Sequence, residues 1–193
     1  MPSYIFISPR SDPGMGHPLT DPIMGRGVRP TMGTCRPDIR RLVRPGDQIF
    51  VISGSMGPGV RQYVVGGIEV GSKLIDQLAA YEKYPEHRLD FNGRIKHGNI
   101  IVTAAGNQDP RDRHSNFDRR IVNYIEGRSQ VVLETEKEVS LGREYSANIL
   151  ARIFEKPKGS SIREIIGRHR KMTELQANTL RHALRELKRE ARR

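Results

Sequence analysis

RRLVRPGDQIFVISGS, residues 40–55, is the stretch that decides how the fold is interpreted. Pro45, Gly46 and Asp47 are typical turn residues, because proline fixes φ, glycine permits a positive φ and aspartate accepts hydrogen bonds from the turn backbone. The apolar run after them predicts a β-strand, which ends in Ser53, Gly54 and Ser55. The turn alone explains Pro-Gly-Asp. Small residues at the end of the strand would also leave room for a planar ring.

A second β-run, VRQYVVGGIEV at residues 60–70, follows a short glycine loop, and the two runs predict a hairpin. Gly66 and Gly67 inside it indicate a bulge or the close approach of another backbone or a ligand. The glycine loop is not a phosphate-binding P-loop, because Val60-Arg61 replaces the required Lys-Ser/Thr pair. It also joins two strands and does not open a helix, so a dinucleotide fingerprint is excluded.

Outward from this hairpin, β-runs alternate with short helical patterns. Residues 8–34 are interrupted by Pro and Gly every few positions, which predicts an irregular segment that forms a lid or lines a pocket. The other expected elements are strands at 3–7, 99–105 and 130–134, helices at 35–44, 73–84 and 120–127, and a short element at 146–150. The pattern predicts an α+β domain over residues 1–155, with a small mixed β-barrel or sheet and inserted helices.

The last 34 residues have a different character. Ser161 and Thr173 each begin a capping-box pattern, with Glu164 and Gln176 three positions later. Apolar residues then recur at helical spacing from Ala177 onward. Residues 160–193 carry ten Arg or Lys and four Glu, so we expect a basic helical hairpin that contacts nucleic acid, docks on an acidic partner or covers the core.

Composition narrows the classes of protein. The 193 residues carry a net charge of +11, from 33 basic and 22 acidic side chains, which favours a polyanionic partner. Trp is absent and aromatic residues make up 6%, so a broad base-stacking platform is not expected. No apolar run is long enough for a transmembrane helix, and no leader pattern begins the chain; we therefore expect a cytoplasmic protein with no membrane partner.

Metal and cysteine chemistry have little support. Cys35 is the only cysteine, which excludes a disulfide and any multi-cysteine zinc site, and an inert packing role is expected for it. No two of the six histidines are three or four residues apart. We therefore expect no metal and no cofactor.

The richest polar cluster is RDRHSNFDRRIVNYIEG, residues 111–127. In the simpler interpretation, Ser115 or Asn116 caps the short helix that follows. In the other, the helix N-terminus and the arginines bind a phosphate while Asn116 contacts a base edge. The two roles are compatible.

These segments resemble a known family. The strand, glycine loop and VVGGIEV run are similar to PUA-like domains, the superfamily that includes ASCH, EVE and YTH domains. Thr34 to Arg40 (TCRPDIR), Phe117 to Arg120 (FDRR) and Tyr124 to Gly127 (YIEG) resemble the second type of nucleotide-modification-associated domain. That resemblance implies a PUA-like fold and a role in phage or bacterial systems that make, recognise or process modified DNA bases. It also implies that Ser53, Gly54 and Ser55 line the mouth of a pocket, flanked by Arg36, Arg40 and Arg41. The Pro-, Gly- and Met-rich early segment and the basic tail depart from the family pattern.

The sequence thus leads to one main hypothesis, a domain that binds a modified base, in DNA or as a nucleotide, in a pocket rimmed by arginines, with RNA as an alternative partner. A second hypothesis is an enzyme on nucleotides or bases, with His114, Asp118 or Asp38 as acid or base. A third is a nucleic-acid-binding adaptor that docks on a protein through residues 160–193. The residues expected to bind are Arg36, Arg40, Arg41, Ser53, Ser55, His17, Asn116, Arg119 and Arg120.

Overall fold

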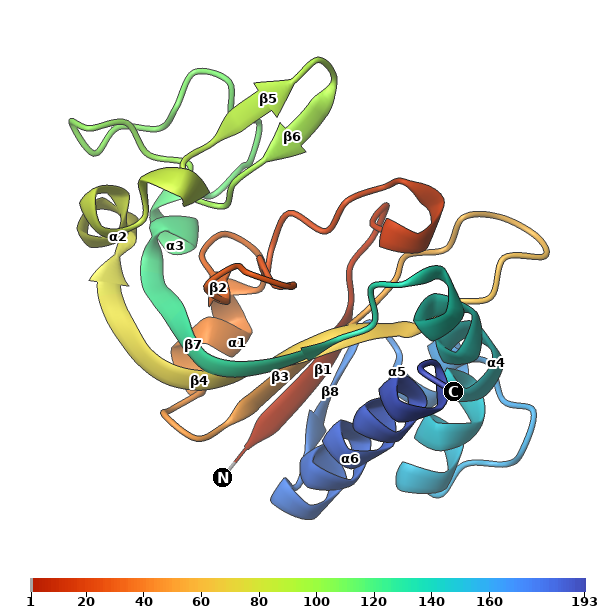
Figure 1. Cartoon of the computed structure of the whole chain (residues 1–193). Helices are drawn as coiled ribbons and strands as arrows, with labels where there is room; N and C mark the ends of the chain where they lie inside the picture. Colours follow the sequence, from red (N-terminus) through yellow and green to blue (C-terminus); the bar gives the residue numbers. More distant parts are fainter. Residues whose placement is uncertain (1) are drawn as a thin grey trace. The chain divides into compact units, whose positions relative to one another are not determined.

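The computed structural model describes residues 2–193, which form an α+β protein with one six-stranded mixed sheet and one separate hairpin. The strand order in the sheet is β2-β7-β4-β3-β1-β8 (Figure 1). Because β2 and β8 are its edges, the sheet is open; of the two predicted alternatives, a barrel or a sheet, the structure contains the sheet. The strands of the sheet are β1 (Ser3–Ile7), β2 (Thr31–Met32), β3 (Gln48–Ile52), β4 (Val64–Asp76), β7 (Val122–Val132) and β8 (His169–Met172).

The chain divides into two compact units. Unit 1 comprises residues 2–19, 47–68 and 130–193, and unit 2 comprises residues 20–46 and 69–129. Strands β4 and β7 are each divided, with one part in unit 1 and the other part in unit 2. The helices of unit 1 are α4 (Glu136–Ile153), α5 (Ile162–Ile166), α6 (Glu174–Glu190) and the 3-10 turn η1 (Pro13–Met15). Unit 2 contains α1 (Pro37–Leu42), α2 (Gln77–Lys83), α3 (Phe117–Ile121), the 3-10 turn η2 (Pro85–His87) and the hairpin β5 (Asp90–Asn92) and β6 (Ile95–His97).

In unit 1 the predicted strand β1 pairs in parallel with β3, the strand that follows the Pro-Gly-Asp turn. Both are almost wholly buried, as expected for apolar strands covered on both faces. Gly66 and Gly67 do allow a close approach, because a Cβ would lie 2.3 Å from the Val131 carbonyl oxygen and 2.4 Å from the Phe50 ring, respectively. Of the predicted alternatives, the close approach of another backbone is confirmed at Gly66, whereas the nearest neighbour of Gly67 is a side chain.

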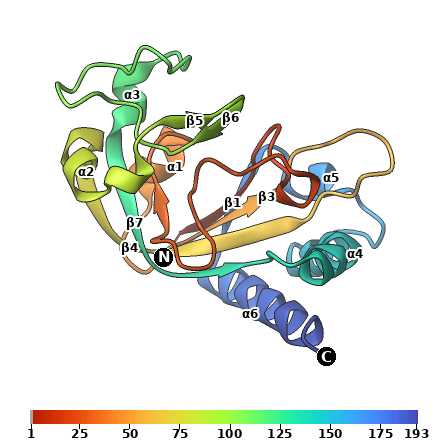
Figure 2. The same ribbon diagram turned by 45° about the horizontal axis from the view of Figure 1, so that its top comes forward.

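The C-terminal segment differs from the expected helical hairpin. Both capping boxes are formed, at Ser161 with Glu164 and at Thr173 with Gln176, as predicted. Between the two helices, however, β8 joins the edge of the sheet antiparallel to β1. α6 packs beside α4 through its apolar stripe (Figures 1 and 2). The basic tail is therefore an integral part of unit 1, because its apolar side chains complete the core.

In unit 2 three predicted elements change. Residues 73–76 extend β4, and Asp76 caps α2 by accepting from the Ala79 N–H at 2.9 Å, so the helix starts later than expected. Residues 99–105 form only isolated bridges; their apolar side chains instead enter a core cluster with Tyr84 and Tyr124. The helix expected at 120–127 ends at Ile121, and β7 begins at Val122 because its Ile125 and Glu126 pair with β2.

Candidate nucleotide-binding site

A pocket of about 670 Å³ lies in unit 2 between the β5–β6 hairpin and the segment that precedes α3. Its walls combine one aromatic ring with several charged side chains. They are Asp90, Phe91, Lys96, Arg111, Arg113 and His114.

The hairpin forms because its sequence offers a two-residue turn. Gly93 takes a positive φ of 60° between Asn92 and Ile95, which pair with each other across the turn. Directly opposed residues share a face of a two-stranded ribbon. Phe91 pairs with Lys96, so the ring and the ammonium group face the pocket together.

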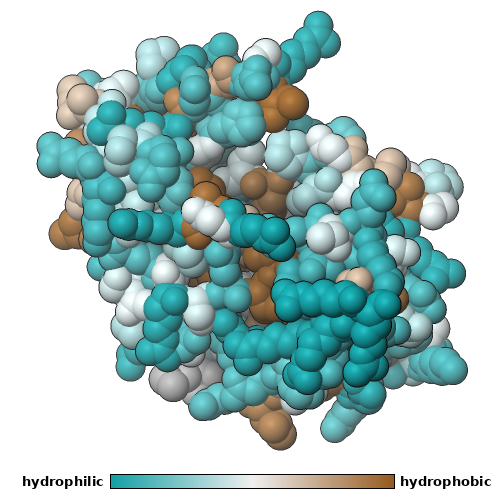
Figure 3. Space-filling view, in the orientation of Figure 1, coloured by the Kyte–Doolittle hydropathy of each residue, from teal (hydrophilic) through white to brown (hydrophobic). Residues whose placement is uncertain are grey.

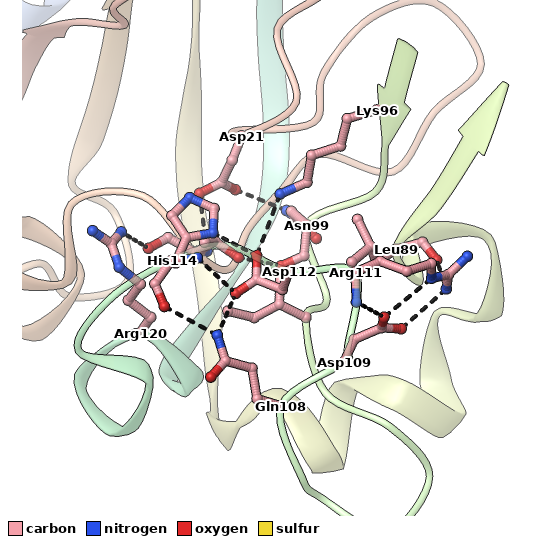
Figure 4. A network of polar contacts seen from close by, with 12 residues as sticks. Asp21, Leu89, Lys96, Asn99, Gln108, Asp109, Arg111, Asp112, His114 and Arg120 are labelled. Atoms are coloured by element: carbon pink, nitrogen blue, oxygen red, sulfur yellow. Dashed lines mark hydrogen bonds and ion pairs between the residues drawn. The ribbon is translucent and has the colours of Figure 1, made fainter. Parts of the chain in front are cut away.

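Asp112 is the buried polar centre behind the pocket wall (Figure 4). Its carboxylate side chain is fully buried and lies 2.6 Å from His114 Nδ1, 2.8 Å from Gln108 Nε2 and 3.6 Å from Lys96 Nζ. Burial by itself raises the pKa of Asp112, but the hydrogen bonds from His114 and Gln108 outweigh it and leave the pKa below its ordinary value. The ionised carboxylate accepts a hydrogen bond from Nδ1–H, and in the neutral imidazole this tautomer leaves Nε2 as an acceptor.

Arg111 is held rigidly at the rim. Its guanidinium donates to Asp109 Oδ1 and Oδ2, both at 3.0 Å, and to the Leu89 carbonyl at 2.7 Å (Figure 4). It also lies 5.9 Å from the centre of the Phe91 ring. These hydrogen bonds from Arg111 lower the pKa of Asp109. Arg113, in contrast, is exposed and makes no ion pair with any residue in the described range, so its donors are open to a ligand.

A second buried network fixes the irregular segment 20–35 within unit 2. The Asp21 carboxylate accepts from the N–H groups of Gly33 at 2.8 Å and Thr34 at 2.9 Å, from that of Cys35, and from Asn99 Nδ2 at 2.9 Å. Asn99 directly follows the hairpin segment and also accepts from Tyr124 at 2.9 Å. The network therefore anchors both the early segment and the base of the hairpin in the same core.

Arg40 does not rim a pocket. Its side chain is fully buried and donates to backbone carbonyls, at 3.0 Å to Cys35, 2.9 Å to Asn123 and 2.7 Å to Arg120, with a further bond to Val122. Burial lowers the pKa of Arg40 to about 10. The expectation that Arg40 binds a phosphate is corrected, because its donors are already occupied by main-chain oxygens.

The other expected residues of α1 lie at its surface. Arg36 has a left-handed conformation at the helix start, with φ of 50°, and pairs with Asp38. Asp38 and Arg41 are exposed and do not line the pocket. Burial raises the pKa of the Cys35 thiol to about 12, which agrees with the inert role expected for it.

Ser53, Ser55 and His17 belong to unit 1, whereas the arginines belong to unit 2. Ser53 is fully buried, and its hydroxyl accepts from the Tyr63 N–H at 3.1 Å. A Cβ at Gly54 would lie 2.6 Å from the Arg10 nitrogen. Backbone packing thus requires the small residues at the end of β3, and the expectation that Ser53 lines a pocket mouth is corrected. Ser55 and His17 are exposed.

The expectation that the side chain of Ser115 or Asn116 caps α3 is also corrected. Asn116 occupies the N-cap position with a left-handed φ of 56°, and no side chain caps the helix. Arg120 donates to the carbonyls of Ser115 at 2.9 Å and Thr34 at 3.2 Å, which ties α3 to the early segment (Figure 4). Asp118 and Arg119 are exposed. Of the expected residues, His114 is the one that lines the pocket.

Sequence analysis did not predict the β5–β6 hairpin, whose side chains form one wall of the pocket. Asn92-Gly93 between short β-type runs is a standard hairpin signal and would have predicted β5 and β6. With Asn92 and Gly93 as the turn, however, Phe91 would have been placed opposite Arg94; the observed turn is Gly93-Arg94, which puts Phe91 opposite Lys96. Asp112 gave no such signal, because its burial depends on contacts with Gln108 and Lys96 from neighbouring segments.

No family model matches this chain, and searches of curated proteins and of solved structures give no match either. Within residues 2–193, no group of three or more His, Cys, Asp and Glu side chains is placed to hold a metal ion. Every helix in that range is too short or too polar to cross a lipid bilayer.

Proposed function

We propose that unit 2 binds a nucleotide, either a modified base in DNA or a free modified nucleotide, in the pocket beside the β5–β6 hairpin. The observation that carries the proposal is the grouping of Phe91, 38% exposed, with Lys96, Arg111 and Arg113 in one pocket. An aromatic ring offers a stacking surface to any base, and guanidinium and ammonium groups bind phosphate.

The roles within the pocket follow from how each group is held. Arg111 is fixed by Asp109, so it forms a preorganised positive wall, whereas Arg113 is open to contact a phosphate. His114, oriented by Asp112, presents Nε2 as a hydrogen-bond partner for the edge of a base. The net charge of +11 favours approach of a polyanion.

The biological setting rests on the sequence resemblance. The resemblance of this chain's segments to PUA-like domains, and to the second type of nucleotide-modification-associated domain, supports the proposal that this reader acts in phage or bacterial DNA modification or defence. The arginines expected from the sequence around α1 are replaced in this proposal by those of the pocket.

Binding to a panel of modified and unmodified oligonucleotides and free nucleotides, at two salt concentrations, tests the proposal. We expect a preference for one modified base that persists at the higher salt. Phe91→Ala should reduce the affinity for that base about 5- to 100-fold, the range for loss of one stacked base. Arg163→Ala removes an exposed charge from α5 of unit 1 and is the control, expected to leave that affinity unchanged. Uniform binding that is lost at high salt and is indifferent to Phe91→Ala would contradict a base-binding pocket.

The Asp112–His114 pair favours a second candidate, an enzyme that acts on nucleotides. A buried carboxylate that orients an imidazole prepares the other ring nitrogen to accept a proton from a nucleophile. Incubation with a nucleotide pool followed by mass spectrometry would reveal a product, and His114→Gln should abolish it. Unchanged masses with every nucleotide that binds would leave the pocket as a reader.

A further inference from the structure

The tip of the β5–β6 hairpin carries an exposed apolar side chain beside a free guanidinium. Ile95 is 46% exposed and directly follows Arg94, which is exposed and forms no ion pair within the described part of the chain. Neither residue lines the pocket. Their exposure is therefore not explained by the nucleotide site.

The pair that closes the turn differs in its surroundings from the pair before it. Lys96 and its partner Phe91 line the pocket, whereas Ile95 and its partner Asn92 do not. The hairpin thus carries an exposed apolar side chain one strand position beyond the residues that line the pocket.

The hairpin is also held in place. A two-stranded ribbon is marginally stable by itself, and this one lies outside the six-stranded sheet. Two ion pairs connect it to the segment before α3, with Lys96 Nζ 3.6 Å from Asp112 and Arg111 Nη1 3.7 Å from Asp90. The tip is therefore a preformed projection, which needs little ordering when it meets a ligand.

We propose that the hairpin tip is a wedge for duplex DNA, in which Ile95 enters the base stack at the position vacated by the base that the pocket takes, while Arg94 contacts the backbone phosphate. This inference rests on the proposed nucleotide-binding function and extends it to the class of substrate, a base extruded from a duplex. Apolar wedge side chains flanked by cations are used in this way by proteins that unstack base steps. A base must leave the duplex before a pocket can enclose it.

The probe for this inference is a DNA duplex with 2-aminopurine next to one G·T mismatch, because a mismatched base costs least to extrude. The full-length protein should increase 2-aminopurine fluorescence as the neighbouring base leaves the stack. Ile95→Ala should reduce that increase at least fivefold. Ile75→Ala is the matched control, since Ile75 is another exposed isoleucine of unit 2, 81% exposed on β4, and should leave the fluorescence increase unchanged.

A second readout separates this inference from the proposed function. Affinity for the free nucleotide that binds best in the panel should be the same for the wild type and for Ile95→Ala, because Ile95 lies outside the pocket. Normal nucleotide binding with an unchanged fluorescence increase in Ile95→Ala would overturn the wedge alone. Absence of wild-type binding to every oligonucleotide and every free nucleotide of the panel would overturn the pocket and the wedge together. An equal response to an RNA duplex of the same sequence would overturn the assignment to DNA.

Discussion

Two arginine-rich segments of unit 2, the α1 region at residues 35–42 and the pocket segment at residues 109–114, look alike in sequence and differ in use. Both place arginines within two residues of an aspartate. In the first, Arg40 is fully buried, and its guanidinium donates hydrogen bonds to backbone carbonyls. In the second, Arg113 is exposed and Arg111 stands at the rim of a pocket. Whether backbone acceptors surround a guanidinium, and not how many arginines a segment has, decides whether it can bind a ligand.

The largest effect is expected at Arg40. Arg40→Ala should lower the free energy of unfolding by roughly 3–4 kcal/mol, because several buried carbonyls lose a charged donor. Urea denaturation measures the change. Arg41→Ala, at the exposed neighbouring position, should stay within about 0.5 kcal/mol of the wild type. Equal changes in the free energy of unfolding for the two variants would contradict a structural role for Arg40, and with it the contrast between the two segments.

A smaller loss of stability is expected at Asp112, in the second segment. Asp112→Asn should lower the free energy of unfolding by about 1–3 kcal/mol at neutral pH, because the amide cannot replace the ionised acceptor for His114 and Lys96. Thermal denaturation at neutral pH measures the loss. An Asp112→Asn protein as stable as the wild type would mean that the carboxylate is not paired as described.

The same carboxylate gives a prediction about pH. The pKa of Asp112 is lower in the folded protein than its ordinary value of 3.8, so its contribution to stability is complete above that value and is lost as the pH falls through the folded pKa. Wild-type stability should therefore drop more steeply than that of Asp112→Asn as the pH falls below about 4. Unfolding measured across that range should show the two curves converging, and parallel curves would contradict a lowered pKa.

The sequence predicted local structure well and the roles of side chains poorly. The strand after the Pro-Gly-Asp turn and the helix begun by Pro37 depend on nearby residues, and the structure contains both. The extension of β7 into the expected helix depends on pairing with β2, 90 or so positions earlier in the chain. The burial of Arg40 likewise depends on carbonyls of residues 120–123, which no pattern near α1 reveals. Contacts between distant segments, which a single sequence does not display, therefore decide which charged residues are free for function.

The smallest expected effect distinguishes the exposed arginines of the two segments. Arg113→Ala should weaken binding of the preferred oligonucleotide modestly and reduce the slope of log K against log salt by about 1, as for loss of one phosphate contact. Arg41→Ala removes the same charge from the surface of α1, outside the pocket, and should leave the slope for that oligonucleotide unchanged. Anisotropy titrations at several salt concentrations give both slopes. If the two variants reduce the slope equally, the DNA binds through the overall positive charge of the surface, and the pocket does not contact a particular phosphate. If only Arg113→Ala reduces the slope, that phosphate contact is assigned to the pocket wall.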